Sequence, residues 1–335
     1  MLGPFPDDLA IRVLPNNAST NHGRNREFAA QLSRTAKDQY QRIVGFDKLP
    51  GLDVLYCADR SIVHKRRLLS KLRPRYRELY EHEEACFAQG RATRLMLLSD
   101  QQREEYCQAW DTESDRVTVL PPNIDAARRH PEYRTSGIRV AKRAELGIAP
   151  NVWLWLAVGA YPHQKGFDHI IEVLQRFADA RVVIVGSDDS APRSQDIIHR
   201  AKQLGVSDRI QWLGLREDVP QLMAAADLLV HPARVETTGT VILEAVINGL
   251  PVITTKVCGY ANHVVAGQAG VVIENAFDYD SLAAALNQAA HQETAARWSA
   301  NGMRYGENPE LYLGHDRATA IILERTADPV ASATA

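Results

Sequence analysis

The sequence predicts an α/β protein with two domains, each built on a doubly wound parallel sheet. Short apolar runs alternate with amphipathic segments along most of the chain, which is the pattern of parallel strands joined by helices. A length of 335 residues, of which 45% are hydrophobic and 24% charged, allows two cores of ordinary size. We expect a first domain over residues 1–135, a linker over 136–150, a second domain over 151–303 and a C-terminal helical segment with a tail over 304–335.

Composition excludes several classes of protein. The formal charge of -2 argues against a nucleic-acid partner. The four cysteines are scattered without zinc spacing, which indicates buried, reduced thiols. The N-terminus carries acids where a signal peptide would be basic, and the longest apolar run, Val152–Val158, is far shorter than a spanning helix. We expect a soluble or peripheral protein.

The first half contains weaker signals than the second. Periodicity and turn residues predict strands over Leu9–Leu14, Arg42–Phe46, Val54–Ala58, Leu95–Ser99 and Val117–Leu120, helices over Glu27–Gln41 and Asp100–Trp110, and a polar loop over Asn16–Asn25.

Two places in this half carry candidate ligand groups. The polar loop offers Asn21, His22, Arg24 and Asn25, which suit a polyol or a phosphate; a solvated turn is the alternative, and spacing alone favours it. Lys48 precedes one predicted strand, and Asp59 follows it at the carboxyl end, where open parallel sheets bind ligands.

The segment Ser61–Arg77 is strongly basic and contains no acid. Leucines and tyrosines interleave with the charges, which favours an amphipathic surface contacting an anionic membrane or a polyphosphate over an ordinary solvated helix face. The candidate membrane residues are Lys65, Arg66, Arg67, Lys71, Arg73, Arg75 and Arg77.

The second half alternates strands and helices regularly. The expected strands are Trp153–Val158, Arg181–Val185, Ile210–Leu213, Leu228–Val230, Val252–Thr255 and Val271–Ile273, and the expected helices are Arg139–Leu146, Phe167–Phe177, Ser194–Leu204, Val219–Ala226 and Ser281–Ala290. No strand is followed by a dinucleotide fingerprint or a P-loop.

The stretch His231–Pro251 has the strongest functional pattern. A Thr-Thr-Gly-Thr turn precedes a helix that ends near Gly249, and the free N–H groups at a helix start bind phosphate. Lys165, in the loop after an earlier strand, is the supplementary cation. Of Glu236 before the turn and Glu244 after it, one could hold the ribose diol and the other the sugar hydroxyls; a helix cap for Glu236 and a surface helix residue for Glu244 are the alternatives.

These residues resemble the family-4 retaining glycosyltransferases, which have the two-Rossmann GT-B architecture with two domains facing a cleft. The resemblance lies in ETTGTVILE at 236–244, VPQLMAAADLLVHPA at 219–233, VGAYPHQKGFDHIIEVL at 158–174, TNHGRN at 20–25, VGFDKLPGLDVLYCAD at 44–59, RATRLMLLSDQQ at 91–102, VLPPNID at 119–125 and TTKVCGYANHV at 254–264. The N-terminal stretches resemble members of the family that act on heptose.

The resemblance implies a role for each matching residue. Gly159 and Lys165 would contact the diphosphate together with the N–H groups of Thr238, Gly239 and Thr240. Glu244 would hold the ribose, Glu236 the transferred sugar and the backbone at Arg216 the uracil, while Asp59 would lie near the reacting anomeric carbon. The residues expected at the acceptor are Asn21, His22, Arg24, Asn25 and Lys48. Attack from the front face implies neither a protein nucleophile nor a metal. Asp278-Tyr279-Asp280 has the form of a metal-binding DxD motif, but it lies just before a predicted helix in the second domain and is expected to cap that helix.

The implied activity is retaining transfer of glucose from UDP-glucose to a heptose of the lipopolysaccharide inner core. The enzyme would act as a monomer, peripherally on the cytoplasmic face of the inner membrane. A sugar-nucleotide epimerase is one alternative, because that chemistry occupies the same architecture. Two departures from the family pattern keep a non-catalytic binding protein as another. Ala160 and Gln164 stand where an arginine is usual, and the family's first strand, Gly-rich loop and helix have no counterpart before Leu9.

Overall fold

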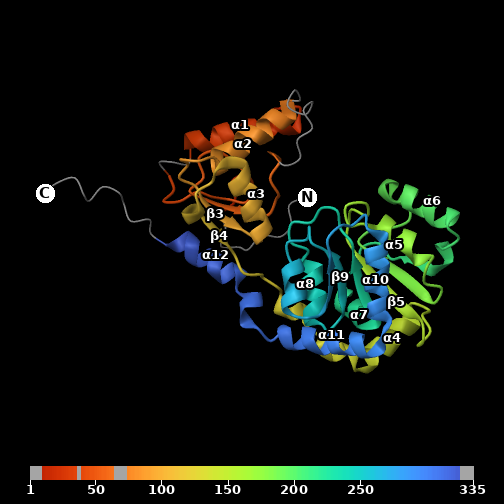
Figure 1. The fold of residues 1–335 in the computed structure, drawn as a ribbon. Helices are drawn as coiled ribbons and strands as arrows, with labels where there is room; N and C mark the ends of the chain where they lie inside the picture. Colours follow the sequence, from red (N-terminus) through yellow and green to blue (C-terminus); the bar gives the residue numbers. More distant parts are fainter. Residues whose placement is uncertain (1–9, 36–38, 64–73, 325–335) are drawn as a thin grey trace. The chain divides into compact units, whose positions relative to one another are not determined.

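The computed structural model describes residues 10–35, 39–63 and 74–324. They form two compact units. One contains the described residues up to Leu97, Gln102–Val119 and Glu324, and the other contains Leu98–Gln101 and Leu120–Leu323. Each unit has its own parallel sheet (Figure 1).

The first unit is built on a four-stranded sheet in the order β1-β2-β3-β4. Its core lies between the sheet and three helices, where Phe87 and Tyr106 stack with ring centroids 3.7 Å apart. The elements are β1 (Val44–Gly45), β2 (Val54–Cys57), β3 (Arg94–Leu97), β4 (Val117–Val119), α1 (Asn21–Thr35), α2 (Pro74–Phe87) and α3 (Asp100–Trp110).

Three sequence predictions in this unit were wrong. Residues 10–14 form no regular structure, and the strand expected over Arg42–Phe46 is only β1. The polar loop ends earlier than predicted, because Thr20 starts α1: its hydroxyl accepts from the N–H of Gly23 (3.2 Å) and its carbonyl from the N–H of Arg24 (2.9 Å). The predicted ligand loop is therefore partly a helix.

The second unit has a six-stranded parallel sheet in the order β10-β9-β8-β5-β6-β7. Its strands are β5 (Trp153–Val158), β6 (Ala180–Val185), β7 (Ile210–Trp212), β8 (Leu228–His231), β9 (Val252–Thr255) and β10 (Gly270–Ile273). Its helices are α4 (Gly137–Glu145), α5 (Phe167–Leu174), α6 (Gln195–Gln203), α7 (Val219–Ala225), α8 (Thr240–Ile247), α9 (Ala261–Ala266), α10 (Tyr279–Ala290), α11 (Gln292–Tyr305) and α12 (Gly314–Leu323).

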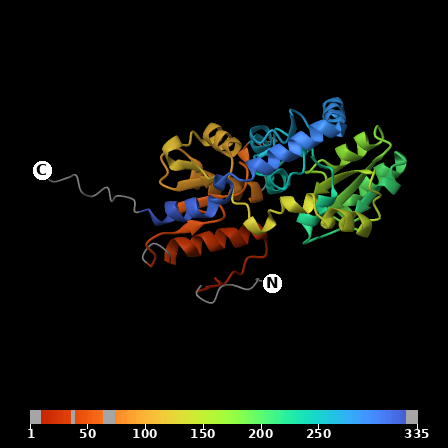
Figure 2. The same ribbon diagram turned by 90° about the horizontal axis from the view of Figure 1, so that it is seen from below.

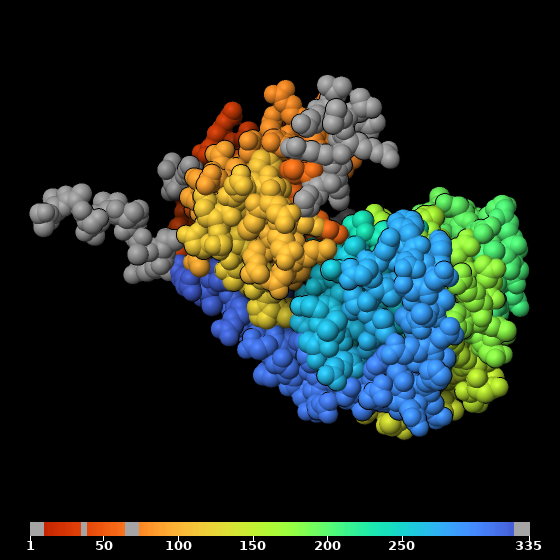
Figure 3. Space-filling model, viewed as in Figure 1, coloured from red at the N-terminus to blue at the C-terminus, as the bar shows by residue number. Residues whose placement is uncertain are grey.

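Helices cover both faces of this sheet (Figure 1, Figure 2). The apolar faces of α7, α8 and α9 pack on one side, and those of α5, α6 and α10 on the other. Figure 3 shows the outer surface of the blue segments, which include α10 and α11; inner side chains of these two helices, such as Leu286 and Trp298, belong to the core around Trp155. The four inner strands β5, β6, β8 and β9 are consequently almost wholly buried, whereas the edge strands β7 and β10 are partly exposed.

Candidate active site

The sheet of the second unit reverses its winding between β5 and β8. These strands are hydrogen-bonded neighbours, with Trp155 opposite Leu228, although β6 and β7 lie between them in the sequence. Open α/β sheets bind ligands at the carboxyl ends of the strands at such a switch point. A ligand site is therefore expected at the loops that leave β5 and β8.

Three side chains from these loops form a charged cluster. The Nζ of Lys165 lies 2.5 Å from Oε2 of Glu236, and Nε2 of His231 lies 3.3 Å from the same oxygen. Burial raises the pKa of Glu236, but the hydrogen bonds from His231 and Lys165 outweigh it and bring the pKa to about 2. Glu236 is consequently ionised at neutral pH.

Glycines allow the two loops to approach each other. Gly166 has φ +72°, and a Cβ there would lie 2.0 Å from the carbonyl oxygen of Pro232. A Cβ at Gly159 would lie 2.7 Å from Cγ of Lys165. Only glycine at these positions leaves room for the backbone contact and for the lysine stem that places the ammonium beside Glu236.

The turn before α8 has the form that the sequence predicted. Gly239 is the N-cap residue with φ +81°, and α8 begins at Thr240 and ends at Ile247 before Gly249. The first N–H groups of a helix have no acceptor within it and carry a partial positive charge. The cluster of Lys165 and Glu236 is joined to this helix start by three residues of chain.

The second acid of the stretch has a partner that the sequence did not suggest. Nε of Arg128 lies 2.5 Å from Oε1 of Glu244, and Nη2 lies 3.3 Å from Oε2. Asn248, four residues after Glu244, donates to the carbonyl of Arg128 and accepts from the N–H of His130. The chain that follows β4 is thus fastened to α8.

Arg234 fastens the loop that carries Lys165. Its backbone N–H donates to the carbonyl of Gln164 (2.8 Å), and its guanidinium bonds both oxygens of Asp168 and lies over the ring of Phe277. Burial raises the pKa of Asp168, but the Arg234 hydrogen bonds outweigh it, so the pKa lies below its ordinary value. Arg234 therefore holds the loop in one conformation.

The side chain of Arg216 is also engaged. It donates to both oxygens of Asp218 (2.7 and 2.6 Å) and to Glu145 (3.1 Å), and these hydrogen bonds raise its pKa. The contact with the uracil that the resemblance implied is therefore left to the backbone of Arg216.

The candidate residues of the first unit lie in different places. Asp59 is exposed just after β2, and its carbonyl accepts from Gln102 (2.8 Å) and Tyr106 (3.0 Å). Lys48 is not a free cation, because its Nζ lies 2.8 Å from the buried carboxylate of Glu83. Because Lys48 already pairs with a buried carboxylate, its ammonium group is a poor candidate for a direct contact with a ligand.

The four candidates of the predicted polar loop share a cavity. Asn21, His22, Arg24 and Asn25, all on the first turns of α1, line a space of about 270 Å³ together with residues of α2. The structure therefore brings these four residues together, on a helix instead of a loop.

Most of the basic segment falls outside the described residues. This applies to Lys65, Arg66, Arg67, Lys71 and Arg73. Arg75 and Arg77 are exposed on the first turn of α2, where Arg77 pairs with Glu81 at 2.9 Å. No helix in the described part of the chain is long and apolar enough to cross a membrane.

Two other features bear on the site. Within the described residues no cluster of His, Cys, Asp and Glu side chains could hold a metal. Asp278 accepts from the N–H of Ser281 at 2.9 Å, which confirms that it caps α10.

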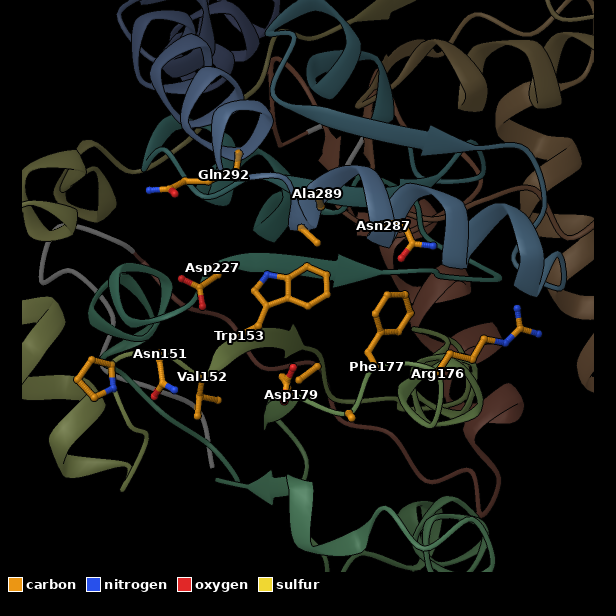
Figure 4. A pocket seen from close by; sticks show the side chains of 15 residues that line it. Asn151, Val152, Trp153, Arg176, Phe177, Asp179, Asp227, Asn287, Ala289 and Gln292 are labelled. Carbon is orange, nitrogen blue, oxygen red and sulfur yellow. The ribbon is translucent and has the colours of Figure 1, made fainter.

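A cavity of about 610 Å³ lies at the opposite edge of the sheet, around Trp153 and Phe177 (Figure 4). Asp179 and Asp227 both line it; Asp227 is held by Arg139 and Arg143 and thus supports the packing of α4. The cavity also lies at the amino ends of the strands, away from the edge at which parallel sheets bind ligands.

Sequence reasoning missed three residues that the structure places at these sites: Arg128, His231 and Arg234. His231 is the first residue of the candidate stretch and directly follows the predicted strand Leu228–Val230, which is a usable signal. The other two are arginines in segments with no periodicity, so only their tertiary partners reveal them.

Comparison with known proteins identifies the family of this chain. The family model described as glycosyl transferases group 1 matches residues 139–305. The chain is 36% identical over 331 residues to lipopolysaccharide glucosyltransferase WaaG of Escherichia coli, covering 96% of this chain and 87% of that protein. It is 32% identical over 208 residues to D-inositol 3-phosphate glycosyltransferase of Nocardia farcinica, covering 58% and 45% respectively.

Solved structures agree in fold. The crystal structure of WaaG superposes with a TM-score of 0.86 at 35% identity, covering 96% of this chain and 89% of that one. The structure of Anabaena Alr3699/HepE in complex with UDP-glucose superposes with a TM-score of 0.69 at 21% identity, covering 88% and 81%. The second likeness bears on the fold alone.

Proposed function

Because this chain belongs to the group 1 glycosyltransferases and has their GT-B fold, we propose that it transfers glucose from UDP-glucose to a heptose of the lipopolysaccharide inner core. The identity to WaaG extends over 96% of the chain and thus includes the unit that would bind the acceptor. The observation that carries the proposal is the pair of Lys165 and Glu236, which meets at the switch point of the sheet beside the start of α8.

The donor diphosphate is proposed to bind at the start of α8. The N–H groups of Thr238, Gly239 and Thr240 supply donors and the positive end of the helix dipole. An ammonium group has three donors, so Lys165 can keep its bond to Glu236 and still donate to a phosphate oxygen. Both contributions favour the charge that develops on the leaving diphosphate.

The two glutamates are proposed to hold hydroxyl groups. Glu236 is a carboxylate at neutral pH, since its pKa is about 2, and it can therefore accept hydrogen bonds from the glucosyl ring but cannot act as a general acid. The leaving phosphate takes the acceptor proton in a front-face reaction that retains configuration. Glu244 is assigned to the ribose diol, for which Arg128 must give up part of its contact.

The remaining assignments come from the family resemblance. Gly159 borders the diphosphate, the backbone at Arg216 contacts the uracil, and Asp59 lies near the reacting carbon. The exposed Arg75 and Arg77 belong to the basic segment, which we assign to the anionic cytoplasmic face of the inner membrane. The enzyme is proposed to work there as a monomer.

Release of UDP tests the proposal directly. Purified protein is mixed with UDP-glucose and lipopolysaccharide that ends at the inner core, and UDP and the anomeric configuration of the product are measured. Lys165→Ala should reduce the rate at least ~100-fold, whereas Lys256→Ala, at an exposed lysine paired with Glu274, should leave it unchanged. UDP binding without acceptor-dependent release in the folded wild type would favour a non-catalytic protein, and a changed sugar without an acceptor would favour an epimerase.

A further inference from the structure

The cavity between α1 and α2 contains a carboxylate without a partner. Glu78, on the second turn of α2, lines the cavity that Asn21 and Asn25 reach from α1. The two helices pack against each other in the first unit (Figure 1). Glu78 is 1% exposed, and among the residues that the structure describes neither of its carboxylate oxygens has a hydrogen-bond partner.

A second buried glutamate on the same helix has the donors that a structural carboxylate requires. Glu83 is 0% exposed, and its oxygens accept from Lys48 (2.8 Å), Ser61 (2.6 Å) and Trp110 (2.9 Å). Burying a carboxylate without donors costs several kcal/mol. Glu78 thus weakens the fold, which is typical of a residue retained for binding.

The neighbours of Glu78 are free to contact a ligand. Asn21 and Asn25 are four residues apart on α1 and therefore point to the same side. In the described part of the chain neither side-chain amide makes a hydrogen bond. His22 and Arg24 are turned back to the preceding loop, where His22 meets the hydroxyl of Thr20 (3.3 Å) and Arg24 donates to the carbonyl of Ala18 (3.1 Å).

This set of groups suits adjacent hydroxyls. A hydroxyl donates one hydrogen bond and accepts others, so a pair of them can donate to the Glu78 carboxylate while exchanging hydrogen bonds with the two amides. The carboxylate of Glu78 would repel a free anion. A divalent cation would find only one carboxylate ligand in this cavity. The volume of the cavity, about 270 Å³, is close to the roughly 300 Å³ of the smallest ligand pockets. A cavity of this size holds one sugar ring but not several.

We propose that Glu78 is a specificity-determining residue that binds two adjacent hydroxyls of one sugar ring in the saccharide acceptor, with Asn21 and Asn25 completing the subsite. The inference rests on the proposed function, since it assigns the cavity to the acceptor of that reaction. It predicts that Glu78 affects recognition of the acceptor and leaves binding of the donor unchanged.

Replacing Glu78 with glutamine tests the proposal. The change keeps the shape of the side chain but removes the charge that strengthens the hydrogen bonds, so the KM for the inner-core acceptor should rise about 10- to 100-fold. The calorimetric affinity for UDP should stay the same. Glu81→Gln makes the same chemical change at an exposed position on α2 and should change neither quantity.

Stability separates binding from a structural role. Glu78→Leu removes an uncompensated buried charge and should raise the melting temperature while it weakens the acceptor interaction. A lower melting temperature in both Glu78 variants, or an unchanged acceptor KM in Glu78→Gln, would overturn the proposal. Asn25→Ala, at a partly exposed position, provides a second test of acceptor binding without a buried change.

Direct titration keeps this inference distinct from the proposed activity. Deacylated inner-core saccharide and intact lipopolysaccharide are titrated into the wild type and into Glu78→Gln. Saccharide binding that Glu78→Gln weakens supports the subsite even if no UDP is released. Binding of intact lipopolysaccharide alone, equal in the two proteins, would mean that the lipid and not the sugar is recognised and would refute it.

Discussion

Replacing Lys165 with methionine tests whether Lys165 and Glu236 act as one unit. Methionine keeps an apolar stem of similar length but lacks the ammonium group that lies 2.5 Å from Oε2 of Glu236. The side chains of the pair are only 17% and 13% exposed, so water replaces the lost contact poorly. The variant should therefore lose stability as well as activity.

The magnitude follows from the pKa of Glu236. A fall from the ordinary value of 4.5 to about 2 corresponds to about 3 kcal/mol of stabilisation, supplied jointly by His231 and Lys165 against the cost of burial. We therefore expect Lys165→Met to reduce the free energy of unfolding by about 1–3 kcal/mol. Because the folded pKa lies below the unfolded one, this stabilisation is complete above about pH 4.5 and is lost as the pH falls toward 2.

Urea unfolding of a double-mutant cycle measures the coupling. Lys165→Met, Glu236→Gln and the double variant are compared at pH 7. The two single variants together should lose about 1–2 kcal/mol more free energy of unfolding than the double variant loses. Lys256→Met is the matched control, since this lysine is 68% exposed beside Glu274, and it should cost less than about 0.5 kcal/mol. Additive losses within about 0.5 kcal/mol would refute a coupled pair.

Three further predictions concern other contacts. Arg234→Ala should free the loop around Gln164 and lower kcat/KM about 10-fold with little change in the fold, and an unchanged value would show that Asp168 alone holds the loop. Arg128→Gln should tighten UDP binding about 2- to 5-fold, because Glu244 then has no competing partner; weaker binding in calorimetry would make Arg128 itself a ligand. Burial lowers the pKa of His263 from 6.5 to about 4, so between these pH values the unfolded chain is protonated at this histidine while the folded chain is not. The free energy of unfolding therefore falls as the pH drops from about 6.5 to about 4. His263→Phe should lose less stability than the wild type between pH 7 and 4.5, and an equal loss would assign the acid sensitivity to other groups.

Local sequence signals were sufficient for much of the second unit. The apolar run Trp153–Val158 has the bounds of β5, and the Thr-Thr-Gly-Thr turn leads into α8 at Thr240 as predicted. Each of these elements depends on residues close together in the chain: a continuous apolar run, a glycine that tolerates positive φ, and a helix start. The first unit was predicted less well, because Thr20 starts α1 inside a segment whose composition is that of a loop.

The sequence by itself determined the class of fold and the two loops that would hold charged groups, since periodicity and turn chemistry are local properties. The tertiary structure decided which of these groups meet. Lys165 and Glu236 are 71 residues apart and pair only because β8 lies beside β5 in the sheet. Arg128 reaches Glu244 across 116 residues, while Glu78 is buried and its carboxylate has no hydrogen-bond partner among the described residues. Such pairings depend on strand order and helix packing, which bring together residues that are far apart in the sequence. No local sequence pattern encodes these contacts.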